Sequence, residues 1–184
     1  MNTDKKILKE LNQRKSVRTF STKAIESEKL DALWAAAQWA PSSSNRHGWR
    51  YYAIMGSARA KFAEVLGRGN HWALEAPLLL AVVWDNAVES KTESRDYGMY
   101  NVALSVMSLV IEAEHQGLRA HQMAGFKEEI FRKVLDVPAH EFPAVVVAVG
   151  YEGDVAALPP EIQAKENHPR TRKAIEEIVK IIND

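Results

Sequence analysis

The chain has 184 residues, which is long enough for one substantial hydrophobic core and short for two domains. Lys plus Arg and Asp plus Glu both number 24, so no overall charge favours binding to nucleic acid or to a membrane surface. The absence of cysteine excludes disulfides, thiol chemistry and cysteine-ligated metals. The first residues lack the apolar core of a signal peptide and no apolar run reaches about 18 residues, so we expect a cytoplasmic protein.

The first dense cluster of positive charge follows a short amphipathic helix that the apolar spacing predicts over residues 4–13. Arg14, Lys15 and Arg18 supply the charge, and Ser16 adds a hydroxyl among them. Two interpretations stay open from the residues alone. Cations favour helix C-termini, so the cluster can be a solvated helix end, or its forked arginine donors can hold a phosphate.

A second polar stretch separates an amphipathic helix from a strand. The helix stops at Pro41, the short residues Ser42, Ser43 and Asn45 follow, and residues 49–55 have the pattern of a strand. Proline, serine and asparagine are common in turns because they fix φ or satisfy nearby backbone groups. The stretch is therefore either a simple helix stop or a rigid turn against which a flat polar ligand lies.

Apolar strands alternate with helices through the rest of the chain. Residues 77–84 and 144–151 form nearly continuous apolar runs, as in strands covered on both faces, and residues 96–116 form the longest predicted helix. Residues 86–95 are polar and predict a surface loop. Within the long helix, Asn101 is either a structural hydrogen-bonding group or a ligand contact. This alternation by itself favours a parallel, doubly wound sheet.

The last part of the chain is too short for a second core, so we expect one domain over residues 1–184. Residues 152–184 read as a connector followed by an apolar docking tail, with Arg170 and Arg172 between them. Several enzyme classes lack their motifs. No GxSxG, GxGxxG, Walker A or HExxH pattern occurs, so a serine nucleophile elbow, a dinucleotide or nucleotide loop and a zinc site are not expected.

Taken in order, the polar segments resemble the nitroreductase family of FMN-dependent oxidoreductases. The resemblance covers nearly the whole chain, and it depends on five stretches in a particular order. These are residues 14–20, residues 40–45 followed by Trp49, residues 96–117, residues 123–126, and residues 170–172 ahead of residues 178–179.

The resemblance implies a fold different from the one that the pattern alone favours. It implies an α+β, three-layer fold with a mixed, largely antiparallel sheet flanked by helices. We adopt this fold, partly because the dinucleotide fingerprint of the doubly wound alternative is missing. The family forms an intertwined homodimer with FMN at the interface and C-terminal segments that cross to the partner, which implies the same here.

The resemblance also implies the site. By this resemblance, Arg14, Ser16 and Arg18 hold the FMN phosphate and ribityl chain, and Arg170 or Arg172 near the C-terminus assists them. Asn101 reaches the pyrimidine edge, and the Gly125 N–H points towards flavin N5. The whole set of implied cofactor-binding residues is Arg14, Lys15, Ser16, Arg18, Pro41, Ser42, Ser43, Asn45, Asn101, Met123, Ala124, Gly125, Arg170 and Arg172. No metal is expected.

The implied reaction passes hydride from NAD(P)H through the flavin to a small electron-poor acceptor, such as a nitroaromatic or a quinone. Because the flavin carries the chemistry, no catalytic side chain is expected. Alternatives are a specialised flavin reaction (flavin destruction, dehalogenation or dehydrogenation), a non-catalytic flavin-binding module, or a dimeric scaffold that has lost its flavin site. The chain departs from the family at His47-Gly48, where Gln-Pro is common.

Overall fold

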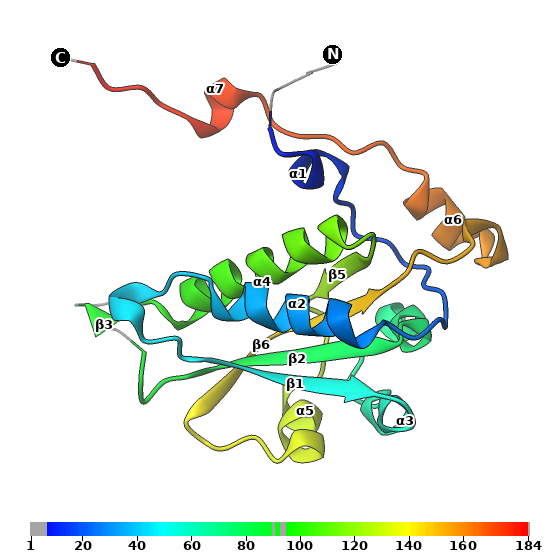
Figure 1. Ribbon diagram of the computed structural model, residues 1–184, viewed down its shortest axis with the longest axis horizontal. Coiled ribbons are helices and arrows are strands. Elements are labelled where there is room, and N and C mark those ends of the chain that lie inside the picture. The colour runs from blue at the N-terminus through cyan, green and yellow to red at the C-terminus, as the bar shows by residue number, and fades with distance from the viewer. Residues whose placement is uncertain (1–6, 90, 93–94, 184) are drawn as a thin grey trace. The chain divides into compact units, whose positions relative to one another are not determined.

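The computed structural model describes residues 7–89, 91–92 and 95–183. It contains two compact units, Met1–Asp154 and Val155–Asp184, and each is described by itself. In the first unit four strands form one sheet in the order β1-β2-β6-β5 (Figure 1), and every neighbouring pair is antiparallel. The strands are β1 (Trp49–Met55), β2 (Leu78–Asp85), β5 (Arg119–Met123) and β6 (Glu141–Gly150). The α+β prediction is therefore confirmed, and the parallel sheet that the pattern alone favoured is wrong.

Helices cover both faces of this sheet. In Figure 1, α2 (Ser27–Gln38) and α4 (Gly98–His115) lie over one face, and α3 (Ala58–Phe62) and α5 (Glu128–Leu135) lie over the other. Side chains of β2 alternate between two cores, because successive residues of a strand point to opposite faces. Leu78, Leu80 and Val82 pack in the core below α2 and α4, whereas Leu79, Ala81 and Val83 pack in the opposite core. The first unit thus has three layers.

The strand β6 begins earlier than the sequence predicts, at Glu141 rather than at residue 144, so Pro143 lies inside it. Proline cannot donate a ladder hydrogen bond, and it is tolerated in strands mainly at edges and bulges. Pro143 lies opposite Val83, next to a register shift in the β2–β6 pairing, and β5 pairs only with residues 146–150 of β6. The proline therefore occupies a bulge that β5 does not reach.

The remaining elements are short. The first unit also contains α1 (Lys9–Gln13), the 3-10 turns η1 (Ser43–Asn45) and η2 (Arg68–Glu75), and the small strands β3 (Lys91–Thr92) and β4 (Arg95–Asp96). The helix predicted over residues 4–13 thus appears as α1, and its first three predicted residues lie outside the described ones. The second unit contains η3 (Val155–Ala157), α6 (Pro160–Glu166) and α7 (Ile175–Ile178). Among the described residues, no helix is long and apolar enough to cross a membrane.

Candidate active site

The polar loop, residues 41–47, is held in place by a hydrogen-bonded serine beneath it. Ser105 of α4 is fully buried, and its Oγ donates to the carbonyl oxygen of Ala37 near the end of α2 over 2.9 Å. The Tyr51 hydroxyl of β1 lies 2.9 Å from the same Oγ. Burial raises the pKa of Tyr51 to about 12, so its hydroxyl keeps its proton at neutral pH. One side chain thus joins α2, α4 and β1 just where the loop begins.

The polar loop itself has an unusual backbone. Ser44, Asn45 and His47 have φ values of 55°, 55° and 50°, in the left-handed region that is costly for side-chain-bearing residues. Local hydrogen bonds hold this shape, since Ser42 Oγ accepts from the His47 N–H over 2.9 Å and the Ser42 carbonyl accepts from the Asn45 N–H over 3.0 Å. Such strained backbone tends to gather at functional sites. The loop is a built feature rather than a simple helix stop.

Asn101, in the first turn of α4, fastens the polar loop from below. Its Oδ1 accepts from the Ser43 N–H over 3.1 Å, and its Nδ2 donates to Glu89 Oε2 over 2.5 Å. The Asn101 side chain is fully buried and Glu89 is only 6% exposed. The structural hydrogen bond that the sequence left open is therefore present. A contact between Asn101 and a flavin stays a prediction.

Glu89 is a residue that the sequence did not single out. It lies in the polar stretch that predicted a surface loop, yet it is buried, and its Oε1 has no hydrogen-bond partner among the described residues. Gly48 makes room for it, because a Cβ on Gly48 would lie 2.8 Å from Glu89 Cδ and closer still to Oε1. The departure at position 48 thus has a structural reason. The one feature of the sequence that pointed to a buried neighbour such as Glu89 was the glycine at position 48, between the polar loop and β1.

We expect Gly48→Ala to lower the free energy of unfolding by about 2 kcal/mol, because the added methyl group overlaps a buried carboxyl group. Denaturant titration of the variant and the wild type measures this difference. Gly69→Ala is the matched control, since a Cβ there meets no atom of the described residues within 4 Å, and it should change stability by less than about 0.5 kcal/mol. Equal stabilities for the two variants would show that Glu89 moves aside freely.

The basic loop, residues 14–18, lies beside β5. The His121 ring, on β5, places Nδ1 2.7 Å from the carbonyl oxygen of Val17. Lys15 is engaged within the protein, because its Nζ forms an ion pair of 2.5 Å with Glu152, which also accepts from Arg119 Nε over 2.9 Å. Burial opposes ionisation of Glu152, but these two cations together lower its pKa. The charge of Lys15 is therefore already balanced by a carboxylate within the protein.

A tight turn follows β5 at Ala124, Gly125 and Phe126. The Gly125 carbonyl accepts two hydrogen bonds, from the Gly67 N–H over 3.1 Å and from Asn70 Nδ2 over 2.9 Å. No described residue accepts a hydrogen bond from the Gly125 N–H. This donor is therefore available at the end of β5, the strand that lies beside the basic loop.

The structure arranges the predicted residues in groups. Pro41, Ser42, Ser43 and Asn45 gather over Asn101 at the β1 edge of the sheet. Met123 ends β5 at the opposite edge, and Ala124 and Gly125 follow it. Arg14, Lys15, Ser16 and Arg18 lie in the basic loop beside β5. Arg170 and Arg172 belong to the second unit, and their part in the site stays a prediction. Two hollows of about 330 and 360 Å³ flank the polar loop and share Gln38 and His47.

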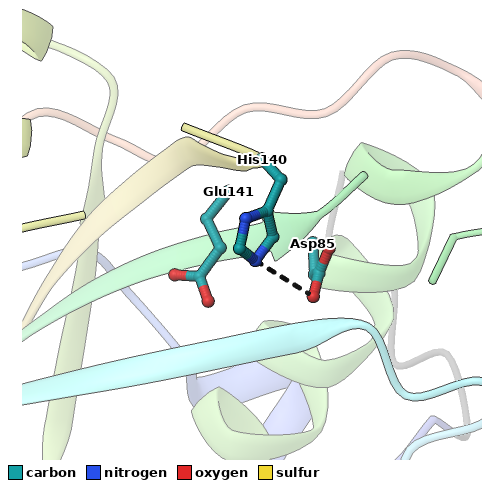
Figure 2. A group of neighbouring side chains, drawn as sticks. All are labelled: Asp85, His140 and Glu141. Carbon is teal, nitrogen blue, oxygen red and sulfur yellow. Dashed lines mark ion pairs between the residues drawn. The ribbon is translucent and has the colours of Figure 1, made fainter. Parts of the chain in front are cut away.

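A separate cluster of Asp85, His140 and Glu141 has ligand atoms within 4.8 Å of one another (Figure 2). In Figure 2 the His140 ring points to Asp85, at 3.7 Å, whereas the Glu141 carboxylate points away from Asp85. That carboxylate already has partners, because Arg50 lies 3.0 Å from Oε1 and the Tyr52 hydroxyl donates to Oε2 over 3.0 Å. Burial and the Glu141 charge raise the pKa of Tyr52, which keeps it a donor. We therefore assign no metal to this cluster.

Comparison with known proteins identifies a family model and solved structures that this chain matches. The model of the Nitroreductase family matches residues 11–70 and 66–151. A solved structure of an oxidoreductase containing FMN superposes with a TM-score of 0.87 at 25% identity, over 97% of this chain and 92% of that one. Curated relatives include FMN reductase [NAD(P)H] of Bacillus subtilis, 24% identical over 90% of this chain and 74% of its own length. Another is iodotyrosine deiodinase of Haliscomenobacter hydrossis, 25% identical over 85% and 83% respectively.

The three-layer α+β fold, with the polar loop at one sheet edge and the basic loop at the other, is shared with the FMN-containing oxidoreductase. The chain belongs to the nitroreductase family. The resemblance inferred from the sequence is thereby confirmed.

Proposed function

We propose that this protein is an FMN-dependent oxidoreductase that takes hydride from NAD(P)H and delivers it to an electron-poor acceptor such as a nitroaromatic or a quinone. The observation that carries the proposal is the Gly125 N–H, from which no described residue accepts a hydrogen bond and which a fixed turn holds at the end of β5, the strand beside the basic loop. FMN, when bound, supplies the redox chemistry at N5. The names of the FMN reductase and of the FMN-containing neighbour support the same cofactor.

The residues present suit this cofactor. FMN phosphate is a dianion, and Arg14 and Arg18 offer forked, charge-assisted donors to it. Ser16 is exposed beside them and adds a hydroxyl. Glycine at 125 lets backbone approach a ring closely, and an N–H directed at N5 stabilises the reduced ring. The protein's part is to bind, orient and polarise, which accounts for the lack of a catalytic dyad in the sequence.

The proposal includes a homodimer, because one chain cannot bring both the polar loop and the Gly125 turn to the same flavin ring. Tyr52, Ala81, Val146 and Met123 lie side by side across the four strands. Met123 is therefore about 14 Å from β1, and the polar loop lies further along that strand. This separation exceeds the reach of a three-ring heterocycle. A second copy would supply the polar loop.

Exposed apolar side chains support a second copy as well. Trp39 is 86% exposed, Met99 50% and Tyr100 59%, all near the polar loop or the start of α4. Large apolar groups clustered on a surface mark interaction sites. The tail residues Ile178, Ile181 and Ile182 are also exposed, and β1 is an edge strand that a partner's tail could cover.

A cytoplasmic location stays a prediction.

The test is the absorption spectrum of the purified protein before and after NADH or NADPH is added without oxygen, with FMN supplied if the protein is colourless. We expect flavin bands that bleach on addition of the nucleotide and return when a quinone is added. Failure to take up FMN would contradict the proposal. Flavin that NAD(P)H does not reduce would favour a non-catalytic flavin-binding module.

A specialised reaction is the second candidate. It is favoured by the likeness to a relative named iodotyrosine deiodinase and by the His47-Gly48 pair with its buried Glu89, where the family commonly has Gln-Pro. The spectral test distinguishes it, since such an enzyme would bind FMN but return slowly to the oxidised state with a simple quinone.

A further inference from the structure

The turn that carries Gly125 is held by a segment outside the sheet. Residues 65–67 pair with residues 125–127, since the Gly67 N–H donates to the Gly125 carbonyl over 3.1 Å and the Lys127 N–H donates to the Val65 carbonyl over 2.8 Å. Asn70, at the start of η2, adds its Nδ2 to the same Gly125 carbonyl over 2.9 Å. The Asn70 N–H in turn donates to the Gly67 carbonyl over 2.8 Å. One carbonyl oxygen thus receives both a backbone and a side-chain donor.

Two glycines permit this close contact. A Cβ on Gly67 would lie 3.0 Å from the Gly125 carbonyl oxygen, and a Cβ on Gly125 would lie 3.0 Å from Asn70 Nδ2. Either side chain would push the donor and the acceptor apart. The two chain segments are therefore adapted to each other at the level of single atoms.

The contact fixes the direction of the Gly125 N–H. The Ala124 carbonyl accepts from the Phe126 N–H over 3.1 Å, which sets the plane of the peptide between Ala124 and Gly125. In a trans peptide the N–H points opposite to the C=O. The Gly125 N–H therefore leaves the turn on the far side from Phe126. Asn70 holds the next peptide, so the turn is constrained on both sides of Gly125.

The Asn70 segment is itself anchored to the basic loop. Two residues on, Trp72 has its ring 4.6 Å from the His121 ring and 6.1 Å from the Phe20 ring, centroid to centroid. His121 contacts Val17 of the basic loop. The same short segment thus connects the two predicted contacts to FMN, the phosphate end and the N5 end.

We propose that Asn70 is a positioning residue, which fixes the Gly125 turn so that its N–H is directed at N5 of the bound flavin. This inference rests on the proposed FMN-dependent function. Asn70 does not touch the flavin; it acts through the Gly125 carbonyl. Its removal loosens the turn and weakens the donor at N5, so the reduced flavin loses stabilisation relative to the oxidised flavin.

The experiment compares Asn70→Ala and Asn70→Asp with His71→Ala as control. Alanine removes the donor without adding charge, and aspartate keeps the shape but supplies only acceptors. His71 is exposed on the same segment, and no hydrogen bond of its side chain occurs among the described residues. The two readouts are the midpoint potential of bound FMN and hydrogen exchange at the Phe126 amide in the flavin-free protein.

For both Asn70 variants we expect the equilibrium constant for two-electron reduction of bound FMN to fall about tenfold, which is about 30 mV. Exchange at the Phe126 amide should quicken about tenfold, because opening of the turn becomes easier. His71→Ala should match the wild type in both. A shift with aspartate but not with alanine would mean a charge effect and overturn the inference.

The two proposals fail in different ways. Wild-type protein that takes up no FMN overturns the proposed function and this inference with it. Wild-type protein that binds FMN, together with Asn70 variants that keep its potential, overturns the inference alone. Variants that lose FMN affinity while the remaining bound flavin keeps the wild-type potential show a merely structural role, and they also overturn it.

Discussion

Asn101→Ala should lower the free energy of unfolding by about 3–5 kcal/mol, because one change removes the partner of the half-buried Ser43 N–H and that of the buried Glu89 carboxyl group. The Ser43 N–H loses its acceptor, and the buried Glu89 carboxyl group loses its only hydrogen-bond partner among the described residues. Each unpaired buried group costs about 1–3 kcal/mol, and more when charged. Denaturant titration at fixed protein concentration measures the loss, since assembly otherwise shifts the midpoint.

Ser108→Ala serves as the control for Asn101. Ser108 lies on the same helix, and its hydroxyl donates to the carbonyl of Leu104 one turn back, over 3.0 Å, its sole hydrogen bond within the described part of the chain. Its loss should cost less than about 1 kcal/mol. If Asn101→Ala were as stable as this control while FMN affinity fell, direct flavin contact would be the main role of Asn101, contrary to our interpretation of the Glu89 network.

Arg14→Ala should weaken FMN binding by about 10- to 150-fold. A hydrogen bond to a charged group contributes about 1.5–3 kcal/mol, and each 1.4 kcal/mol is about tenfold in affinity. Titration of flavin-free protein with FMN, followed by quenching of flavin fluorescence, measures the dissociation constant. Added salt should narrow the difference in FMN affinity between the variant and the wild type, because salt screens the attraction between exposed charges.

Lys15→Ala is the comparison within the same loop. Its ammonium group already pairs with Glu152 at 2.5 Å, so it has less to offer a phosphate, and we expect a loss below about tenfold. Equal losses at both positions would show that the loop acts as a diffuse positive patch. Unchanged affinity for Arg14→Ala would mean that the phosphate is held elsewhere.

Local patterns in the sequence predicted most of the framework. Strand β1 has the predicted bounds, β2 is shifted by one residue, and α4 falls within the predicted helix. Apolar periodicity reports which face of an element is buried, and this depends on neighbours along the chain. The start of β6 was missed because proline normally ends strands, and the bulge that accepts Pro143 depends on β2.

The site residues also divide into those that the sequence identified and those that only the structure identified. The serines of the polar loop and the arginines of the basic loop stand out by composition, so the sequence was enough to single them out. Glu89 and Asn70 do not stand out, because a single polar residue in a polar stretch looks solvated. Burial under Gly48 and contact with Gly125 distinguish them, and both contacts join segments more than 35 residues apart.

The sequence by itself determined the family, the order of the main helices and strands of the first unit, and the polar and basic loops, since each of these depends on residue types at short spacing. Through the family resemblance the sequence also implied a largely antiparallel sheet, whereas only the tertiary structure decided the order of the strands in it, that the two loops lie at opposite sheet edges, and that Glu89 and Asn70 support them. The physical reason is that strand order and buried polar contacts depend on pairings between distant segments, and local propensity carries no information about them.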